Sequence, residues 1–488
     1  MNQSSLIKKI WNYATILKDS GVSYTEYVRQ VTYLLFLKMD YERKTLLKEE
    51  SMLPSKFYWN TITDKSGAEL ERHYSNILDT LSRDTGIIGT IFLRARNEIT
   101  EPAKLKQLIS LIDKETWYEL DMDVKGAIYE GLLEKNSTET KGGAGQYFTP
   151  RSLIRAIVQV MRPTPEMSVV DPACGTGGFL LAAYDYMKKQ TRDSRTLKEL
   201  RTNKLFGNDI TPLVVNLCAM NLYLHGIGGG KCPVEKKDSL LQAGAKRYDM
   251  CLTNPPFGTK SSNVENMDEE GNITRTNNTY EREDFIATTS NKQINFLQHI
   301  MTILKTPGYA AVVVPDNVLF EGGDKDEKIR AGEKVRQRLL NEFNLHTILR
   351  LPTGIFYKPG VKANVLFFEK HPPLKNGHRT KDVWIYDLRT NAHFTLVENP
   401  MTDKHLDDFV RCYHAEDRSK RKESERFKKF TYDELVKRDK TNLDITWIKD
   451  ESLQELENLP KPEVLLTSII TNLKTSLVAF ESIKKKLK

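Results

Sequence analysis

The sequence has few cysteines and no long apolar run. Its five cysteines are scattered along 488 residues and include no C-x-x-C pair. This pattern argues against a disulfide framework and a zinc site, and it fits a reducing cytoplasm. The longest apolar runs, such as residues 310–314, cannot span a bilayer, and the N-terminal residues do not read as a secretory leader. We therefore expect a cytoplasmic protein without a metal site or a membrane segment.

The composition also lacks the marks of a disordered chain. Hydrophobic residues make up 39% of the chain and charged residues 28%, which is ordinary for a folded protein. At about 150 residues per domain, the length allows two to four structural units. The formal net charge of +8 favours an acidic partner such as nucleic acid, but an ordinary solvated basic surface explains it equally well.

Changes in the pattern of apolar and polar residues divide the chain into regions. Helical spacing of apolar residues predicts a helical N-terminal domain over residues 1–134. Residues 135–145 contain three glycines and no apolar side chain larger than alanine, as in a flexible connector. From residue 146 to 400, short β-rich runs alternate with helical stretches, which predicts an α/β domain with a largely parallel sheet. The expected strands are 168–171, 204–209, 248–254, 309–315, 346–352 and 364–370, and the expected helices are 151–161, 179–189, 211–225, 290–304 and 330–342.

Three further segments stand out. Residues 258–284 are polar and too long for an ordinary connection, so we expect a mobile loop there. A charge run over 418–429 lies within a C-terminal region, 401–488, that we expect to be helical. Its last part has a stripe of apolar residues with 4-3 spacing, which predicts either a coiled-coil strand for subunit assembly or a helix packed on its own domain. The stripe consists of Leu466, Ile470, Leu473, Leu477, Phe480 and Leu487.

The first motif with chemical meaning is the glycine-rich segment from Val169 to Leu180. A strand ending in Asp171 leads into a turn in which glycines let the backbone approach a ligand. The turn is neither a dinucleotide fingerprint nor a phosphate loop, because the glycine spacing differs and no lysine follows. These departures favour a smaller ligand, for which Asp171 would face a cationic amine or sulfonium. A glycine turn without a ligand role is the alternative.

Two aspartates follow at the ends of the next expected strands. Asp209 is placed to accept both hydroxyls of a ribose, as acidic residues after the second strand of such folds do. Asp238, in the loop after an expected third strand, suits the exocyclic amine of an adenine. In isolation, Asp238 is read more simply as a turn residue.

The fourth motif, TNPPFG, directly follows an apolar strand. Pro255 and Pro256 remove two backbone donors and fix φ, so rigid carbonyls and the Asn254 amide project from the strand end. An acceptor-rich pocket of this kind suits an incoming NH₂ group, and Phe257 offers an aromatic face for a base. By composition, such a four-residue match arises by chance in roughly a few per cent of chains. Its position after the other three motifs makes the match more specific.

Together, D-P-A-C-G-T-G-G and N-P-P-F resemble the motifs of S-adenosylmethionine-dependent amino-group methyltransferases of DNA. GQYFTPRSLIRAIV upstream is similar to the cofactor motif that precedes the glycine loop in their gamma arrangement, and N-P-P-F resembles the adenine-N6 form. With the later LPTGIFYKPGVKANVLFFEK and DLRTN segments, the resemblance covers most of the chain. The family that the chain resembles is the modification (M) subunit of type I restriction-modification systems. The implied fold is a Rossmann-like methyltransferase domain with a helical N-terminal domain and a C-terminal helical tail.

The resemblance implies a set of site residues. The residues expected to contact S-adenosylmethionine are Gln146, Tyr147, Phe148, Thr149, Pro150, Arg151, Asp171, Thr176, Gly177 and Gly178, with Asp209 on its ribose and Asp238 on its adenine. Asn254, Pro255, Pro256 and Phe257 would form the catalytic motif around the target adenine. Asn254 Oδ1 and the Pro255 carbonyl would accept hydrogen bonds from the two N6–H groups, and the adenine would have to leave the duplex.

The resemblance also implies partners. These are double-stranded DNA, a specificity subunit with two copies of this chain for each, and in some assemblies a restriction subunit. A stand-alone adenine methyltransferase is one alternative, but it needs a recognition domain of about 150 residues, for which the C-terminal part is too short. A protein glutamine methyltransferase, which uses a similar N-P-P-Y motif, is another. The helical N-terminal domain and the C-terminal stripe count against it.

Overall fold

The computed structural model describes most of the expected domains. The described residues are 9–10, 12–13, 23–117, 131, 148–257, 263–267, 273–277, 280–321, 330–356, 360–396, 399–449 and 466. The expected connector, Gln146, Tyr147 and the C-terminal stripe beyond Leu466 therefore lie outside the described residues. In the described part of the chain, no helix combines the length and apolarity needed to cross a membrane.

The N-terminal region is helical, as predicted. Its helices bury one apolar face, as in α4, where buried side chains recur at spacings of three and four residues from Leu70 to Leu81. Ser23 caps α2 by accepting a hydrogen bond from the backbone N–H of Glu26. The elements are α2 (Tyr24–Leu47), the 3-10 helix η1 (Ser55–Phe57), α3 (Trp59–Thr63), α4 (Gly67–Leu81), α5 (Gly86–Ile91) and α6 (Pro102–Asp113).

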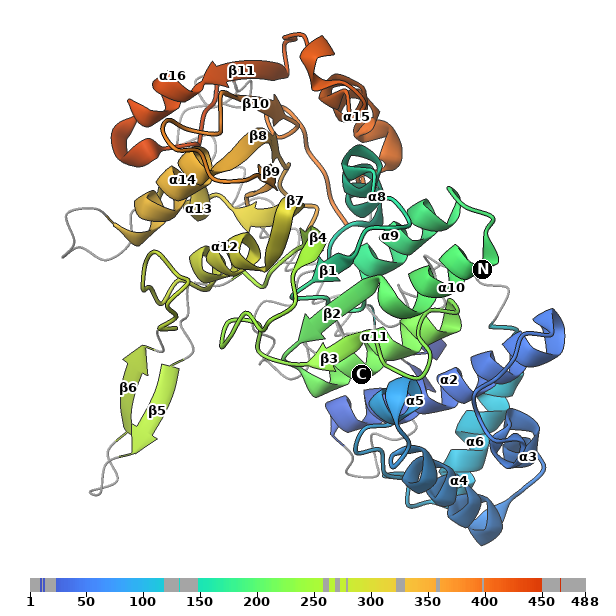
Figure 1. Ribbon diagram of the computed structural model, residues 1–488. Coiled ribbons are helices and arrows are strands. Elements are labelled where there is room, and N and C mark those ends of the chain that lie inside the picture. The colour runs from blue at the N-terminus through green and yellow to red at the C-terminus, as the bar shows by residue number, and fades with distance from the viewer. Residues whose placement is uncertain are drawn as a thin grey trace.

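The second region is built on a nine-stranded mixed sheet with the order β11-β10-β8-β9-β7-β4-β1-β2-β3 (Figure 1). All six strands expected from the sequence are present. The strands are β1 (Val169–Asp171), β2 (Leu205–Asp209), β3 (Val234–Lys236), β4 (Tyr248–Thr253), β7 (Leu304–Pro315), β8 (Phe343–Arg350), β9 (Ala363–Lys370), β10 (Asp382–Asp387) and β11 (Phe427–Thr431).

Helices cover both faces of this sheet. Successive residues of β1 point to opposite faces, so Val169 belongs to one buried cluster and Val170 to the other. Figure 1 shows α8, α9 and α11 on one side and α12 and α14 on the other. The helices are α8 (Arg151–Met161), α9 (Gly178–Lys188), α10 (Ser194–Asn203), α11 (Pro212–Leu224), α12 (Lys292–Ile303), α13 (Asn317–Phe320), α14 (Ala331–Glu342), α15 (Asp407–Tyr413) and α16 (Tyr432–Val436), with 3-10 turns η2 (Asp403–His405), η3 (Arg418–Lys420) and η4 (Asp439–Thr441).

The strand order reverses direction at β1. The chain passes from β1 to β2 and β3 on one side, then returns to β4 on the other, and β1 is parallel to both β2 and β4. In open α/β sheets, ligands bind outside the carboxyl ends of the strands at such a reversal. The ends of β1 and β4 carry the two central motifs of the sequence, so the topology brings these motifs together.

The helical N-terminal region packs on α11. Asn216 Nδ2 donates to the carbonyls of Thr90 and Ile91 at 2.6 and 2.9 Å. Near the other end of α11, Arg43 Nη1 donates to the Tyr223 carbonyl at 2.8 Å, and the Tyr223 hydroxyl donates to Asp40 at 3.0 Å. Because α11 begins directly after Asp209, the N-terminal region supports a helix that leads out of the ligand edge.

The structure differs from the sequence-based expectation at three places. β9 is antiparallel between β7 and β8, an orientation that a short apolar run does not reveal. Within the expected mobile loop 258–284, β5 (Asn263–Met267) and β6 (Ile273–Asn277) pair as an antiparallel hairpin, which we did not predict; the mobility of the segment stays a prediction. The segment is polar, but β6 contains three β-branched residues, which favour strands.

The third difference is the boundary after residue 400. We expected 401–488 to form a separate helical region, but β11 pairs with β10 and adds the ninth strand to the sheet. The sequence pattern does not reveal β11, because its two adjacent lysines, Lys428 and Lys429, lie between Phe427 and Phe430 on a strand at the sheet edge. The sheet domain therefore continues at least to Thr431.

Candidate active site

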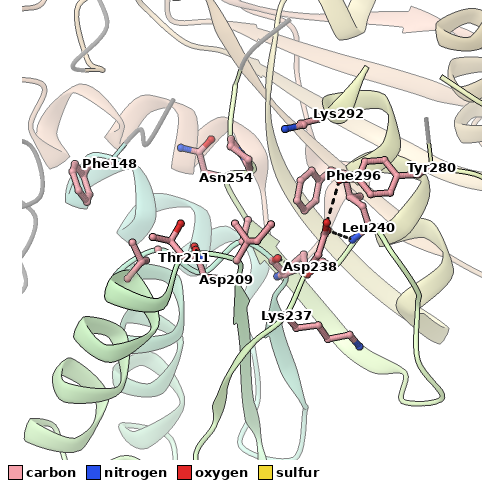
Figure 2. Close-up of a pocket in the computed structure, with 17 residues that line it drawn as sticks. Phe148, Asp209, Thr211, Lys237, Asp238, Leu240, Asn254, Tyr280, Lys292 and Phe296 are labelled. Carbon is pink, nitrogen blue, oxygen red and sulfur yellow. Dashed lines mark hydrogen bonds between the residues drawn. The ribbon is translucent and has the colours of Figure 1, made fainter. Parts of the chain in front are cut away.

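A pocket opens at the carboxyl ends of β1, β2 and β4, at the point where the strand order reverses (Figure 2). Five residues that the sequence predicted for the site line it. They are Phe148, Asp209, Asp238, Asn254 and Pro256. The pocket thus gathers residues that are more than a hundred positions apart in the chain.

Asp171 lies beneath this pocket and is not part of its lining. Its side chain is 2% exposed, and its Oδ1 accepts hydrogen bonds from Thr253 Oγ1 at 2.6 Å and from the backbone N–H of Ala173 at 3.1 Å. Burial raises the pKa of the Asp171 carboxyl to about 7. Asp171 therefore ties the end of β1 to the end of β4, whereas we had expected it to face a cationic group of the ligand.

The glycines of the turn have different roles. Gly177 has φ +85°, and a Cβ there would lie 2.9 Å from Cys218 Sγ of α11. A Cβ at Gly178 would lie 2.8 Å from Arg151 Nη1, so both glycines allow helices to pack closely. Gly175 has φ +53°, lines the pocket and would meet nothing within 4 Å. The close approach to a ligand that we expected at Gly177 is thus available at Gly175.

Thr176 lies within the glycine turn and connects it to α11. Its side chain is buried, and its carbonyl accepts a hydrogen bond from Asn221 Nδ2 of α11 at 2.9 Å. Thr176 is not among the residues that line the pocket. The structure places it as a support for the turn.

Asp209 lies at the end of β2 and forms part of the pocket wall. Its Oδ1 accepts the backbone N–H of Thr211 at 2.8 Å. Burial raises the pKa of this carboxyl, while hydrogen bonds from the backbone N–H groups of Thr211 and Gly175 oppose the rise. Because Gly175 belongs to the glycine turn, Asp209 also links the ends of β1 and β2.

Asp238 lies on the neighbouring wall, after β3. Its two carboxylate oxygens accept hydrogen bonds from the Leu240 backbone N–H at 2.9 Å and from the Tyr280 hydroxyl at 3.1 Å, drawn as dashed lines in Figure 2. The next residue, Ser239, donates to the Pro172 carbonyl at 2.7 Å. Asp238 is therefore more than a turn residue, because it anchors a tyrosine from the far side of the β5–β6 hairpin.

Asn254 carries the most distinctive polar group of the pocket. Its Nδ2 donates to Thr149 Oγ1 at 2.9 Å. Its Oδ1 is buried and has no hydrogen-bond partner among the described residues, a situation that is costly unless a ligand supplies a donor. The amide is thus held by its nitrogen, with its oxygen left as an acceptor.

Of the other three residues of the N-P-P-F motif, Pro255 and Phe257 are buried. Pro255 is buried and Pro256 is exposed on the pocket wall. Phe257 is only 8% exposed, and its ring packs edge-to-face against Phe356 at 5.8 Å. Phe257 is therefore a core residue in this structure, and the open aromatic face that we expected there is absent from the lining.

The segment that leads into α8 contacts the pocket at one end. Phe148 lines the pocket, and Thr149 holds Asn254. Pro150 is the N-cap residue of α8. Arg151 lines a different cavity, between α8 and α9. The contacts of this motif with the pocket therefore end before α8 begins.

Several residues that line the pocket were not predicted from the sequence. Ile210 is 62% exposed, which is unusual for isoleucine, and it directly follows Asp209. Tyr280, Lys292 and Phe296 also line the pocket, the last two one turn apart on α12. An exposed isoleucine can be found only in a structure, but the i, i+4 spacing of Lys292 and Phe296 was a usable signal.

Comparisons with known proteins agree with this geometry. The model of the N-6 DNA Methylase family matches residues 120–455, and that of the HsdM N-terminal domain matches residues 6–112. The chain is 37% identical to the type I restriction enzyme StySPI methylase subunit of Salmonella potsdam and to the EcoKI methylase subunit of Escherichia coli K12. Both alignments cover 100% of this chain and 96% of the relative.

Solved structures give the same result. The crystal structure of the type I restriction enzyme EcoKI M protein matches with a TM-score of 0.53 at 33% identity, covering 99% of this chain and 96% of that one. A chain from a study of complex assembly and conformational transition in a type I restriction-modification system matches with a TM-score of 0.65 at 26% identity, covering 100% and 99%.

The sheet, its pocket and these matches define an S-adenosylmethionine-dependent methyltransferase fold, and the chain belongs to the N-6 DNA methylase family. Within that family it is a type I methylase subunit, since the full-length relatives and the N-terminal domain are of that kind.

Proposed function

We propose that this chain transfers a methyl group from S-adenosylmethionine to N6 of an adenine in DNA, within a complex whose specificity subunit reads the sequence. Asn254 supports this proposal most directly. Its buried, unpartnered Oδ1 is the acceptor that an exocyclic amino group needs, and it lies on the wall of a pocket shared with Asp209 and Asp238.

Asn254 would act by holding the amino nitrogen in a reactive geometry. The lone pair of adenine N6 is delocalised into the ring, so the nitrogen is a weak nucleophile. Hydrogen bonds from the two N6–H groups to Asn254 Oδ1 and the Pro255 carbonyl favour a pyramidal nitrogen with a localised lone pair. Thr149 fixes the Asn254 amide through its nitrogen, so the acceptor is already oriented before the adenine enters.

The pocket residues fit S-adenosylmethionine, which supplies an electrophilic methyl group on its sulfonium. Asp209 would accept the ribose hydroxyls from the end of β2. The open space at Gly175 lets the ligand approach the backbone closely, and the exposed side chain of Ile210 offers apolar surface to a purine ring. Asp238 would accept the adenine amine, since a carboxylate has about four lone-pair sites and two hydrogen bonds occupy only part of them.

The chain's partners follow from its relatives. We propose that it joins DNA, a specificity subunit in a two-to-one complex and, in some assemblies, a restriction subunit. The C-terminal stripe stays a prediction for the contact with the specificity subunit. The match to methylase subunits along the full chain favours this assembly over a stand-alone adenine methyltransferase, and even more over a protein glutamine methyltransferase.

The experiment compares Asn254→Ala with Asn203→Ala, an exposed asparagine on α10 that serves as the matched control. Each variant is purified with the specificity subunit and assayed for transfer of labelled methyl groups to duplex DNA. We expect Asn254→Ala to lose roughly 10²–10³ in rate, about 3–4 kcal/mol, because one oriented acceptor is gone. Calorimetry should show unchanged S-adenosylmethionine binding for both variants.

The identity of the methylated base distinguishes adenine-N6 methylation from methylation of another base. Digestion of the methylated DNA and mass spectrometry should find N6-methyladenine. Another methylated base, or near-normal turnover by Asn254→Ala, would overturn the assignment.

A further inference from the structure

A second cavity lies at the β10–β11 edge of the sheet, far along the strand order from the candidate active site. Its lining includes Asp382 and Trp384 at the start of β10, and Lys429 of β11. β10 is parallel to β8, and β7 and β8 are both antiparallel to β9. β10 therefore runs in the same direction as β4 and β7. The start of β10 lies at the edge opposite to the one that holds Asn254.

Arg421 is the most buried of the cationic residues that line this cavity. It is 93% buried, as its exposed fraction is 7%, and no carboxylate pairs with it among the described residues. Its Nε donates to the Tyr413 carbonyl at 2.8 Å and its Nη1 to the His346 carbonyl at 3.2 Å. Its Nη2 is buried without a hydrogen-bond partner in the described part of the chain. Burial lowers the pKa of Arg421 to about 10, so the charge persists at neutral pH.

Further basic side chains surround Arg421. Arg418 also lines the cavity, but it is paired with Glu369 at 2.5 Å. Lys422 and Lys429 are exposed on the cavity wall and have no ion pair among the described residues. Two carboxylates, Asp382 and Glu423, belong to the same lining, and Glu423 accepts the backbone N–H of Lys429 at 3.0 Å. The cations that remain after the Arg418 pair still outnumber these carboxylates.

We propose that this cavity binds a phosphate group through Arg421, Lys422 and Lys429. The Arg421 guanidinium lies over the Tyr413 and Phe427 rings at 4.6 and 5.8 Å but forms no salt bridge with a described carboxylate. Phosphate is the anion that arginine forks and lysine ammonium groups bind most readily. Trp384, half-buried beside Lys429, would offer an aromatic face to a base next to that phosphate. The phosphate belongs either to the backbone of a DNA segment outside the target or to a free nucleotide.

Strand alternation supplies a matched control for this proposal. Lys429 pairs with Trp384 on the cavity side of β11, while its neighbour Lys428 lies over the Trp447 ring at 5.8 Å on the other face. Lys420 is 71% exposed in the same charge run as Lys422 but does not line the cavity. The pairs Lys422→Gln/Lys429→Gln and Lys420→Gln/Lys428→Gln therefore remove the same charge from the same two segments.

Both pairs are made in the full chain and titrated with sodium pyrophosphate and, separately, with a short DNA duplex at several salt concentrations. We expect the cavity pair to weaken binding about tenfold and to reduce the salt slope for DNA by about two, one for each lysine. The control pair should match the unaltered protein. A loss confined to pyrophosphate assigns the site to free nucleotides, and a loss confined to the duplex assigns it to the DNA backbone. Equal behaviour of the two pairs with both probes would overturn the proposal.

Arg421→Lys tests the buried guanidinium itself. The variant keeps the charge but loses the forked donors, so phosphate binding should fall several-fold even with both lysines in place. A thermal melt shows whether the fold is kept. Unchanged phosphate affinity in a folded Arg421→Lys protein would mean that Arg421 only holds the carbonyls of Tyr413 and His346.

Discussion

The turns that follow β1 and β4 lie side by side at the same sheet edge, yet they treat their motif residues differently. In the β1 turn, Asp171, Thr176 and Gly177 face inward, and Gly175 opens to the pocket. In the β4 turn, Asn254 and Pro256 face the pocket, and Phe257 packs inward. A motif therefore contains both the residues that meet a ligand and the residues that shape the turn, and only the structure separates the two kinds.

Phe257→Ala should have the largest effect on stability within these turns. The ring is buried against Phe356, and removing a buried phenylalanine costs about 3–5 kcal/mol. Urea denaturation should show this loss, while Pro256→Ala, which alters the exposed neighbour, should cost far less. If Phe257→Ala left the unfolding free energy unchanged and weakened only DNA binding, the ring would serve the target base after all.

Gly177→Ala and Gly175→Ala form a matched pair, because both glycines have positive φ. Each alanine pays a similar conformational strain of about 1–2 kcal/mol. Only the Gly177 variant also places its Cβ against Cys218. We expect the Gly177 variant to show the lower melting temperature and the Gly175 variant the weaker S-adenosylmethionine binding. The reverse pattern in the two assays would return the ligand contact to Gly177.

Asp209→Ala tests the carboxylate on the pocket wall at the end of β2. Loss of the ribose acceptor should weaken S-adenosylmethionine about tenfold, equivalent to 1.4 kcal/mol. Calorimetry measures this, and Asp193→Ala at the N-cap of α10 is the control, since that carboxylate also accepts a backbone N–H but does not line the pocket. Equal affinity of Asp209→Ala and unaltered protein would remove Asp209 from the site.

The same division explains what the sequence could predict. Periodicity is a local property, so α8 was predicted over its full length and the central strands to within a few residues. The motifs identified the sheet edge because parallel strands end together. The inward turn of Phe257 depends on Phe356, about a hundred residues away. The joining of β11 to the sheet likewise depends on β10. Such long-range contacts leave no local pattern.

Over the pH unit around its pKa in the folded protein, Asp171 gives the smallest expected change in stability and the one most specific to its position. Its pKa is about 7 in the folded protein, against an ordinary aspartate value of 3.8, so between these values the folded state holds a proton that the unfolded state has lost. Stability from this group is complete below about pH 4 and is lost as pH rises through about 7. Near the folded pKa, about half a proton separates the two states, and the unfolding free energy should fall by about 0.7 kcal/mol from about pH 6.5 to 7.5.

Asp171→Asn should remove this slope, since asparagine does not titrate and its oxygen can still accept from Thr253 and Ala173. Urea denaturation across that pH range, with the variant subtracted from the unaltered protein, isolates the contribution of Asp171 from all other titrating groups. Parallel pH profiles would show that the Asp171 carboxyl keeps an ordinary pKa. The fold would then have to stabilise Asp171 as a carboxylate, as it does for a residue that faces a cationic ligand. Asp171 could then no longer be counted among the residues of the β1 turn that only shape the turn.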